Sequence, residues 1–486
     1  MEFRYAGSEH NNLTSKNRGK QIMICADMGE LKQRAAPCLT VVGGDVEVAD
    51  EEALRSRLTD DLVYTAVFSP DKATKDAARW LIRRAGVALG IYPASIQSLY
   101  EAMGRKEVSG FTVPAINLRG ITYHAAQAVF RAAIRDNVGA LIFEIARSET
   151  GYTDQRPAEY TTAITAAAIK TGFRGCLFLQ GDHFQFNAKK YAADPDGEGG
   201  AVTDLIREAI AGGFYNIDID ASTLVDLSRP SIREQQEKNY ALTAAMTALI
   251  RQIEPAGVTV SVGGEIGEIG DKNTTVEEFT IFMDAYLDEL HKGGDRQKGI
   301  SKISIQTGTA HGGVPLPDGS IAQVKIDFAA LEDISEVARS TYGLAGAVQH
   351  GASTLPGDAF HRFPETETAE VHLATGFQNI IYDSAHFPAD LRDRIYAYIN
   401  DELRGEKKDT DTEEQFLYKT RKRGFGQFKR DMWELPPETL TEIGTELEDQ
   451  FAFLFDQLNV GDTAEVVARQ VQPVDVPLAV PDALKA

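Results

Sequence analysis

Short apolar runs alternate with amphipathic stretches along most of this chain. From residue 111 onward, runs of strand length recur, either continuously apolar or alternating in polarity. Between them, apolar residues return at the spacing of an α-helix. The pattern predicts strands at 111–116, 140–145, 175–179, 214–219, 258–262, 303–306, 343–348 and 377–382. It predicts helices at 125–135, 159–170, 203–211, 236–253, 276–291, 328–339 and 365–374.

This alternation predicts an α/β fold in which eight strands close into a (β/α)8 TIM barrel. An open Rossmann-like sheet fits less well, because no Gly-x-Gly-x-x-Gly follows the first strand. We place the barrel at residues 91–403. A small N-terminal α/β extension of unknown role precedes it over residues 1–90, and a helical C-terminal extension and tail follow it over residues 404–486.

The C-terminal extension carries an apolar stripe. Five residues recur there at helical spacing: Leu447, Phe451, Leu454, Phe455 and Leu458. Such a stripe is more often a buried face than a ligand site, so we interpret it as a packing or dimer face. A homodimer or a higher homo-oligomer is expected.

The chain is strongly acidic, with a formal net charge of -22. A nucleic acid or an anionic membrane would require a basic face, so neither is expected as a partner. A phosphorylated small molecule is compatible with this charge, because backbone amides can hold phosphate. The three cysteines lack metal-ligand spacing, and no apolar run approaches the ~20 residues that cross a bilayer. A reduced, cytoplasmic protein is the simplest interpretation.

Polar residues gather where the predicted strands end. The C-terminal ends of the strands carry the active site of a (β/α)8 barrel, so polar residues there are candidates for function. In chain order they are Asn117, Ser148, Asp182, His183, Asp220, Ser222, Glu265, His311, His350, Asp383 and Ser384.

Three of these strand-end residues are histidines: His183, His311 and His350. A single histidine is more often a hydrogen-bonded structural residue than a ligand. Three at matching positions instead indicate a metal site of three imidazoles with one open position, a pattern typical of catalytic zinc. The remaining histidines fall in predicted helices or loops and are assigned no role: His10, His124, His291, His361, His372 and His386.

Glycines flank two of the candidate ligands. Gly308 and Gly312 surround His311, and Gly351 follows His350. Glycine lets the backbone approach a ligand closely and exposes its amides. With Ser353 and Ser384 these glycines would form a phosphate cradle over the last two strands, where barrels often bind phosphate. The alternative for each glycine is a plain tight turn.

These motifs, in this order, resemble the class II, metal-dependent aldolases, whose best-known members act on fructose and tagatose bisphosphates. The resemblance covers roughly residues 95–460. Its motifs are Ala115-Ile116-Asn117, Gly181-Asp182-His183, Ile219-Asp220-Ala221-Ser222, Gly264-Glu265-Ile266-Gly267, Gly308-Thr309-Ala310-His311-Gly312, His350-Gly351-Ala352-Ser353 and Asp383-Ser384.

The resemblance implies a role for each matching residue. His183, His311 and His350 would bind Zn²⁺ or another divalent transition metal. Asp182 would move the proton on the C4 oxygen of a ketose, Glu265 would contact the metal, and Asp220 would lie near a second metal position. The residues left for the substrate and its phosphate are Asn117, Ser148, Gly312, Gly351, Ser353, Asp383 and Ser384. In the family a loop after the fifth strand returns a proton to carbon, which implies Glu268 or Asp271 here.

Several positions depart from the family pattern. The lysine and asparagine usual in the eighth-strand motif correspond to Asn379 and Ile381, and a glutamate two residues before Glu265 is replaced by Gly263. The glycine-rich loop after His350 carries Ala352 and Thr354. No lysine follows His311-Gly312. These changes leave the metal ligands whole and alter the groups around the substrate.

Three functions follow from the resemblance. The first is a zinc-dependent aldolase that reversibly cleaves a phosphorylated ketose such as fructose 1,6-bisphosphate. The second is a metal-dependent epimerase or isomerase of a sugar or sugar acid, which the same ligands would serve. The third is a non-catalytic aldolase-like subunit, against which the intact Asp182 and the three histidines argue.

Overall fold

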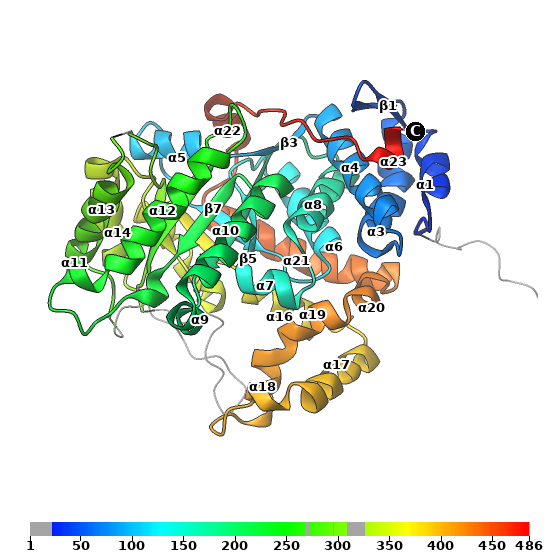
Figure 1. Cartoon of the computed structure of the whole chain (residues 1–486). Helices are drawn as coiled ribbons and strands as arrows, with labels where there is room; N and C mark the ends of the chain where they lie inside the picture. The colour runs from blue at the N-terminus through cyan, green and yellow to red at the C-terminus, as the bar shows by residue number, and fades with distance from the viewer. Residues whose placement is uncertain (1–21, 268–271, 295, 309–325, 486) are drawn as a thin grey trace, which may run out of the picture.

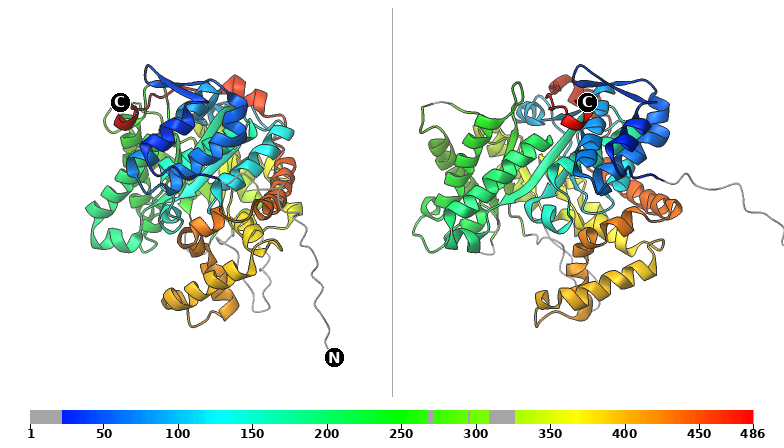
Figure 2. Two further views of the ribbon diagram at one scale, coloured as in Figure 1. Left: turned by 90° about the vertical axis from the view of Figure 1, so that its right-hand side faces the viewer. Right: turned by 45° about the vertical axis from the view of Figure 1, so that its right-hand side comes forward.

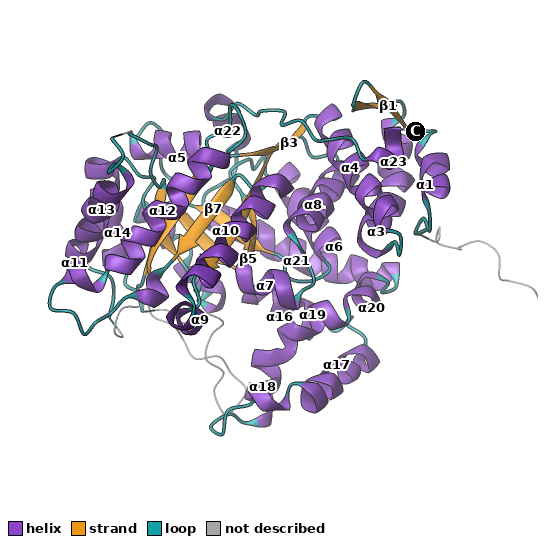
Figure 3. Cartoon of the chain, viewed as in Figure 1, coloured by secondary structure: helices purple, strands orange, loops and turns teal. Residues whose placement is uncertain are grey.

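Eight parallel strands close into a barrel, as the alternation of strand and helix predicts (Figures 1 and 3). The computed structural model describes residues 22–485 apart from 268–271, 295 and 309–325. The barrel strands are β4 (Val113–Asn117), β5 (Ile142–Ala146), β6 (Gly175–Gln185), β7 (Asn216–Asp220), β8 (Ser261–Gly267), β9 (Lys302–Ile305), β10 (Ala347–Gln349) and β11 (Glu370–Leu373). They neighbour one another in chain order, and β11 returns to β4 through the pairing of Val371 with Pro114. A further strand, β3 (Ile91–Ala94), pairs with the first half of β6.

Helices cover the outside of this barrel (Figure 3). Residues that favour the start and the end of a helix mark their limits. Helix α10, for example, starts at Pro195 after an Asp194 cap and ends before Gly213, whose φ of 96° only glycine adopts readily. The helices of the barrel are α6 (Thr122–Arg135), α7 (Arg147–Tyr152), α8 (Pro157–Thr171), α9 (Ala188–Ala193), α10 (Pro195–Gly212), α11 (Ile232–Gln235), α12 (Glu237–Ile253), α13 (Val276–Leu290), α14 (Phe328–Tyr342), α15 (Arg362–Glu365) and α16 (Thr375–Asp383).

The eighth strand was predicted at the wrong place. The first seven predicted strands overlap β4 to β10, but residues 377–382 lie in α16, and β11 lies inside the predicted helix 365–374. Two features of the fold explain the error. Glu370 and His372 are fully buried in the barrel interior, so β11 has no apolar inner face. Helix α16 is apolar because Phe377 packs against Phe451 of the C-terminal extension, with ring centroids 4.7 Å apart.

Charged side chains fill the middle of the barrel, where branched aliphatic residues are usual. The Nζ atom of Lys302 lies 3.0 Å from Asp218 Oδ2 and 2.5 Å from Glu370 Oε1, and it donates to Gln180 Oε1 at 2.8 Å. Tyr100 on α5 (Gln97–Gly104) donates to the other oxygen of Glu370. Each charge is thus paired and hydrogen-bonded, as burial requires.

A glycine makes room for this buried charge cluster. A Cβ atom at Gly263 would overlap the carboxylate of Asp218 and crowd the side chain of Lys302. The glutamate that the class II aldolases usually carry at this position would therefore not fit here. Glycine at position 263 thus accompanies the charged interior of the barrel, because it leaves room for the side chains of Asp218 and Lys302.

The N-terminal extension packs on the outside of the barrel helices (Figures 1 and 2). Its α3 and α4 lie against each other and against α8. Its elements are α1 (Met28–Ala35), the antiparallel pair β1 (Leu39–Val42) and β2 (Asp45–Val48), α2 (Glu51–Ala53), the π-helix Leu54–Leu58, α3 (Thr59–Phe68) and α4 (Lys72–Ala88). The C-terminal tail crosses this extension, where Arg84 pairs with both Asp45 and Asp475.

The C-terminal extension is helical, as predicted. Its longest helix lies along α6 and α16, and the predicted apolar stripe of Leu447 and Phe451 is buried there within the chain. Its elements are α17 (Ala389–Glu402), α18 (Glu413–Thr420), the 3-10 turn Arg421–Arg423, α19 (Gly424–Gln427), α20 (Lys429–Trp433), α21 (Pro437–Gln457), α22 (Ala464–Gln470) and α23 (Asp482–Lys485). Among the described residues, no helix has the length and apolar character needed to span a membrane.

Candidate metal and active site

A β-bulge in β6 brings Asp182 and His183 to the same place. Adjacent residues of a regular strand point to opposite faces. Here the register between β6 and β7 shifts between Gly181 and Phe184, and His183 adopts a φ of 41°, which is unusual for a residue other than glycine. The irregularity turns the His183 imidazole toward the strand ends beside Asp182. The left-handed backbone at a predicted ligand is the kind of strain that functional sites retain.

Four of the predicted site residues converge around His183. Its Nδ1 atom lies 2.9 Å from Glu265 Oε2 and 3.1 Å from Asp220 Oδ2. The rings of His183 and His350 have centroids 4.2 Å apart, and Nε2 of each lies 3.8 Å from Asp182 Oδ1. Glu265 Oε1 lies 3.8 Å from Nδ1 of His350. Side chains from β6, β7, β8 and the residue directly after β10, distant in sequence, therefore share one site.

His311, Gly312 and both candidates for the carbon acid, Glu268 and Asp271, lie outside the described residues. Their predicted roles stay predictions. Within the described residues, the imidazoles of His183 and His350 and the carboxylates of Asp182, Asp220 and Glu265 offer ligand atoms that lie within 4.8 Å of one another in groups of three. Imidazole and carboxylate are ligands that Zn²⁺ accepts.

The sequence analysis missed one residue of this site, His372. It lies near the end of β11, and its Nδ1 atom lies 2.9 Å from Glu144 Oε2 and 3.3 Å from Asp182 Oδ1. Its Nε2 atom lies 2.7 Å from Glu370 Oε1, and its ring packs edge-on against His350. In the sequence, the polar Glu370 and His372 alternate with the apolar Val371 and Leu373, and small residues follow. This pattern was a signal for a strand end. His372 links the strand-end site to the charged interior of the barrel.

Carboxylates and burial set the protonation of this cluster. Burial lowers the pKa of His183, but Asp182 and Glu265 outweigh it and raise that pKa well above its usual value. Burial likewise opposes the charged form of His372, and Glu144 and Asp182 raise its pKa well above the usual value. Burial raises the pKa of Glu265 to about 7, and the nearby Asp220 adds to this effect. The charge of each histidine and carboxylate at the strand ends therefore depends on the balance between burial and the neighbouring charged groups.

A cavity of about 570 Å³ opens from Asp182 and His183 toward the helices after β5 and β6. Ser148, a predicted substrate-binding residue, lines it from the first turn of α7. Asn117, another such residue, is buried behind the cavity, where it donates from Nδ2 to Glu149 Oε2 at 2.7 Å. Four cationic side chains line the same cavity: Arg119, Arg147, Lys190 and Lys422.

Two predicted phosphate-binding residues, Asp383 and Ser384, lie elsewhere than expected. They end helix α16 rather than a strand. Asp383 forms an ion pair with Arg421 at 2.5 Å, and Ser384 donates to Glu446 at 2.8 Å. Their placement at the end of a strand was wrong because the eighth strand was misplaced. Both connect α16 to the C-terminal extension.

Gly351 and Ser353 remain at the strand ends, directly after β10. Gly351 has a φ of 68°, which favours glycine. The Ser353 hydroxyl accepts a hydrogen bond from the Ala374 amide at 2.8 Å and so ties this turn to the start of α16. The loops after the last two strands of the barrel thus lie together, as the predicted phosphate cradle requires.

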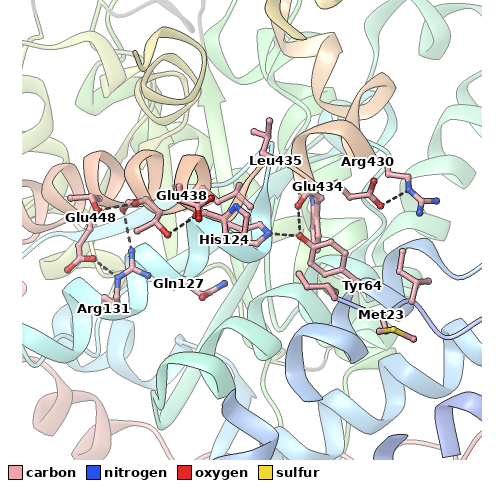
Figure 4. Close-up of a pocket in the computed structure, with 18 residues that line it drawn as sticks. Met23, Tyr64, His124, Gln127, Arg131, Arg430, Glu434, Leu435, Glu438 and Glu448 are labelled. Atoms are coloured by element: carbon pink, nitrogen blue, oxygen red, sulfur yellow. Dashed lines mark hydrogen bonds and ion pairs between the residues drawn. The ribbon is translucent and has the colours of Figure 1, made fainter. Parts of the chain in front are cut away.

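A larger cavity, of about 1320 Å³, lies between the N-terminal extension, α6 and the start of α21. Figure 4 shows His124 pointing toward Tyr64 in its wall, at a distance of 3.0 Å between Nε2 and the hydroxyl. Arg131 and Arg430 are paired with Glu448 and Glu434. The metal-binding groups found among the described residues include none of the residues that line this cavity. Its size alone does not make it the catalytic site.

The donors at the strand ends fit a divalent metal. Two imidazoles lie beside carboxylates, and the Asp220 carboxylate accepts from the imidazole of His183, as the groups that orient metal-binding histidines commonly do. Such a cluster at the C-terminal ends of barrel strands is where (β/α)8 enzymes carry their active sites. Fold and site together define a (β/α)8 barrel with a candidate metal centre.

The chain belongs to the class-II fructose-bisphosphate aldolase family, whose model matches residues 97–430. No curated protein matches the sequence. The family is generally metal-dependent, in agreement with the donors found at the strand ends.

Several solved structures are similar to this chain at low sequence identity. The fructuronate-tagaturonate epimerase UxaE from Cohnella laeviribosi has 10% identity, with 87% of this chain and 93% of that chain covered and a TM-score of 0.56. A probable tagatose 6 phosphate kinase from Sinorhizobium meliloti has 18% identity, with 77% and 96% covered and a TM-score of 0.50. A fructose-bisphosphate aldolase from Campylobacter jejuni has 16% identity, with 77% and 96% covered and a TM-score of 0.46.

Proposed function

We propose that this protein is a zinc-dependent lyase that reversibly cleaves a phosphorylated ketose by a retro-aldol reaction. The observation that carries the proposal is the convergence of His183, His350 and Glu265 beside the Asp182 carboxylate. Family membership supports the reaction class. The two imidazoles with Glu265 would provide the Lewis-acid site of a retro-aldol cleavage, and the adjacent Asp182 carboxylate would provide the base.

His183 and His350, with Glu265, would hold the metal, and His311 would complete the set by its resemblance to the family pattern. A bound divalent cation supplies Lewis-acid stabilisation of the negative charge on the substrate's carbonyl oxygen. Asp220 fixes the orientation of the His183 ring through the contact of 3.1 Å. The turn at Gly351 and Ser353 and the start of α16 would hold the phosphate of the ketose half.

Asp182 is the base of the reaction in this proposal. It accepts the proton of the C4 hydroxyl as the C3–C4 bond breaks, and it returns that proton in the direction of condensation. The bonding electron pair stays with C3, which must then take up a proton, by the family resemblance from Glu268 or Asp271. His372, at 3.3 Å from Asp182 Oδ1, holds this carboxylate in place together with Glu144. Because Asp182 lines the cavity and is otherwise buried, substrate binding would exclude water from it.

The proposal is tested on protein loaded with Zn²⁺ and supplied with fructose 1,6-bisphosphate or tagatose 1,6-bisphosphate. Triose phosphate release, measured with a coupled dehydrogenase, is expected; a chelator should abolish it and added Zn²⁺ should restore it. The Asp182→Asn protein, shown to retain its metal, provides the matched negative control. If metal-loaded protein releases no triose from any ketose phosphate or bisphosphate, the proposed lyase activity is excluded.

A second candidate is a metal-dependent epimerase of a sugar or sugar acid. The proximity of His372 to Asp182 favours it. In an epimerase that breaks a C–C bond and forms it again, the aldehyde half of the substrate turns within the site between the two steps. Two adjacent acid–base groups suit the return of the proton after that turn. The solved structure that carries the name of a fructuronate-tagaturonate epimerase matches across most of the chain, but it shows the fold alone. Interconversion of fructuronate and tagaturonate without triose release would decide for this candidate.

A further inference from the structure

The cavity beside Asp182 carries an excess of positive charge in a chain that is acidic as a whole. Its cations differ in whether the protein already neutralises them. Arg119 donates from Nε to Glu149 Oε1 at 2.7 Å, and Arg147 pairs with Glu198 at 2.5 Å. The charges of both arginines are therefore balanced by the protein itself.

Lys422 is different. Among the described residues, its Nζ atom forms no hydrogen bond and no ion pair, and it lies 5.8 Å from the centroid of the Tyr152 ring. Burial lowers the pKa of Lys422, and the neighbouring Arg119 adds to this effect. Lys190 reaches the same cavity from α9, and no ion pair of its ammonium group occurs within the described residues either. An uncompensated, half-buried ammonium group is costly unless an anion joins it.

Contacts of the neighbouring residues position the backbone at Lys422 beside the barrel. The preceding residue, Arg421, is clamped by Asp383 at 2.5 Å and by Asn379 Oδ1 at 2.8 Å, and its carbonyl accepts from Tyr382 at 2.7 Å. Two glycines allow the close approach of the extension to the barrel. A Cβ atom at Gly120 would overlap the Phe425 ring, and one at Gly426 would overlap the Tyr152 carbonyl.

We propose that Lys422, assisted by Lys190, binds an anionic group at the end of the substrate that leaves as the aldehyde. This inference rests on the proposed function, because it places the reacting bond at Asp182. Asp182 and His183 line the same cavity as the two lysines, together with Arg119 and Arg147. The anion is a phosphate or a carboxylate, since an ammonium group binds either.

Anion binding can be measured without turnover. Isothermal titration calorimetry would follow inorganic phosphate and, separately, D-glycerate, with the wild-type protein and with Lys422→Met, Lys422→Arg and Lys190→Met. Lys419→Met is the matched control, because Lys419 lies three residues away, is exposed and pairs with Asp411. Thermal melting would check that each variant folds; Lys190 is exposed, so its replacement leaves the core intact.

We expect Lys422→Met to weaken anion binding by about tenfold, the loss typical of one charge-assisted hydrogen bond. Lys422→Arg should restore most of it, Lys190→Met should cost roughly two- to threefold, and Lys419→Met should have no effect. If only phosphate binding is weakened, the subsite is assigned to the phosphate of a sugar. If only glycerate binding is weakened, it is assigned to the carboxylate of a sugar acid. If both are weakened, the subsite takes either anion.

Unchanged affinity for both anions in Lys422→Met and Lys190→Met would overturn the proposal, because phosphate would then bind only elsewhere. The outcome is independent of catalysis. A protein that cleaves no ketose but loses anion binding in Lys422→Met keeps the subsite and refutes only the lyase activity. The reverse result, cleavage with unaltered anion binding, refutes only the subsite.

Discussion

Two cavities of this protein each hold a histidine in or beside their walls, and the two histidines have opposite surroundings. His372, next to the cavity at the strand ends, lies among Glu144, Asp182 and Glu370. His124, in the larger cavity, contacts Tyr64 and packs edge-on against Trp433. Carboxylates raise the pKa of the first, whereas burial lowers the pKa of the second to about 3.

The comparison teaches that neither the size of a cavity nor the presence of a histidine marks a catalytic site. The larger cavity of about 1320 Å³ has an aromatic wall and internally paired charges. The smaller one, of about 570 Å³, adjoins imidazoles, carboxylates and uncompensated cations. The convergence of groups that can bind a metal and move protons distinguishes the smaller site.

The largest expected effect is that of Asp182→Asn at the strand ends. Replacing the proposed base by an amide of the same shape should lower kcat for the proposed retro-aldol cleavage by about a thousandfold. The metal content should stay unchanged, which elemental analysis would check. His124→Gln in the other cavity should leave kcat within about twofold. Equal losses in both variants would remove the functional distinction between the cavities.

Lys302→Met tests the charged interior beneath the strand-end site. It removes the cation that neutralises Asp218 and Glu370, so the free energy of unfolding should fall by about 3 kcal/mol. Denaturant unfolding would measure the change. Lys106→Met, which breaks the exposed pair of Lys106 with Glu336, should change stability by less than about 0.5 kcal/mol. A tolerated Lys302→Met would show that the interior charges are not mutually dependent.

His372→Asn should have a smaller effect, which separates positioning from chemistry. Loss of the ring that supports Asp182 should lower kcat by about tenfold, typical of groups that orient a site rather than react. KM and metal content should change little. A loss as large as that of Asp182→Asn would instead give His372 a direct part in proton transfer.

The smallest effect near neutral pH is expected for His124, as a dependence of stability on pH that becomes marked only below pH 6.5. Its folded pKa of about 3 lies below the usual 6.5, so the folded state favours the neutral ring. Its stabilising effect is complete above pH 6.5 and is lost as pH falls toward 3, with at most about 1.4 kcal/mol per pH unit. Unfolding free energies of wild-type and His124→Gln protein should therefore converge between pH 7 and pH 5. A constant difference would contradict the prediction.

Much of the barrel was predictable because most of its strands obey the apolar pattern. β4 to β10 were found from their runs, but β11 was not, since Glu370 and His372 occupy its inner face. Sequence patterns assume an apolar barrel interior, and here a lysine from one strand neutralises carboxylates from others. That compensation is visible only in three dimensions.

The site was predictable in part for the same reason. Asp182, His183, His350, Asp220 and Glu265 were identified from strand ends, and the structure brings them together. The bulge that turns His183 inward left no trace in the sequence, and the misplaced strand moved Asp383 and Ser384 from the site. The predicted domain limits, homo-oligomer and cytoplasmic location stay predictions.

The close fit of the 3-10 turn Arg421–Arg423 and α19 against the barrel has a practical consequence. Lys422 lines the cavity from a segment that contributes no barrel strand and, among the described residues, no candidate metal ligand. Exchanging that segment between family members should redirect substrate preference while leaving the metal chemistry intact. If both proposals hold, selectivity and reactivity are encoded in separate stretches of the polypeptide, joined where Gly120 and Gly426 leave no room for a side chain.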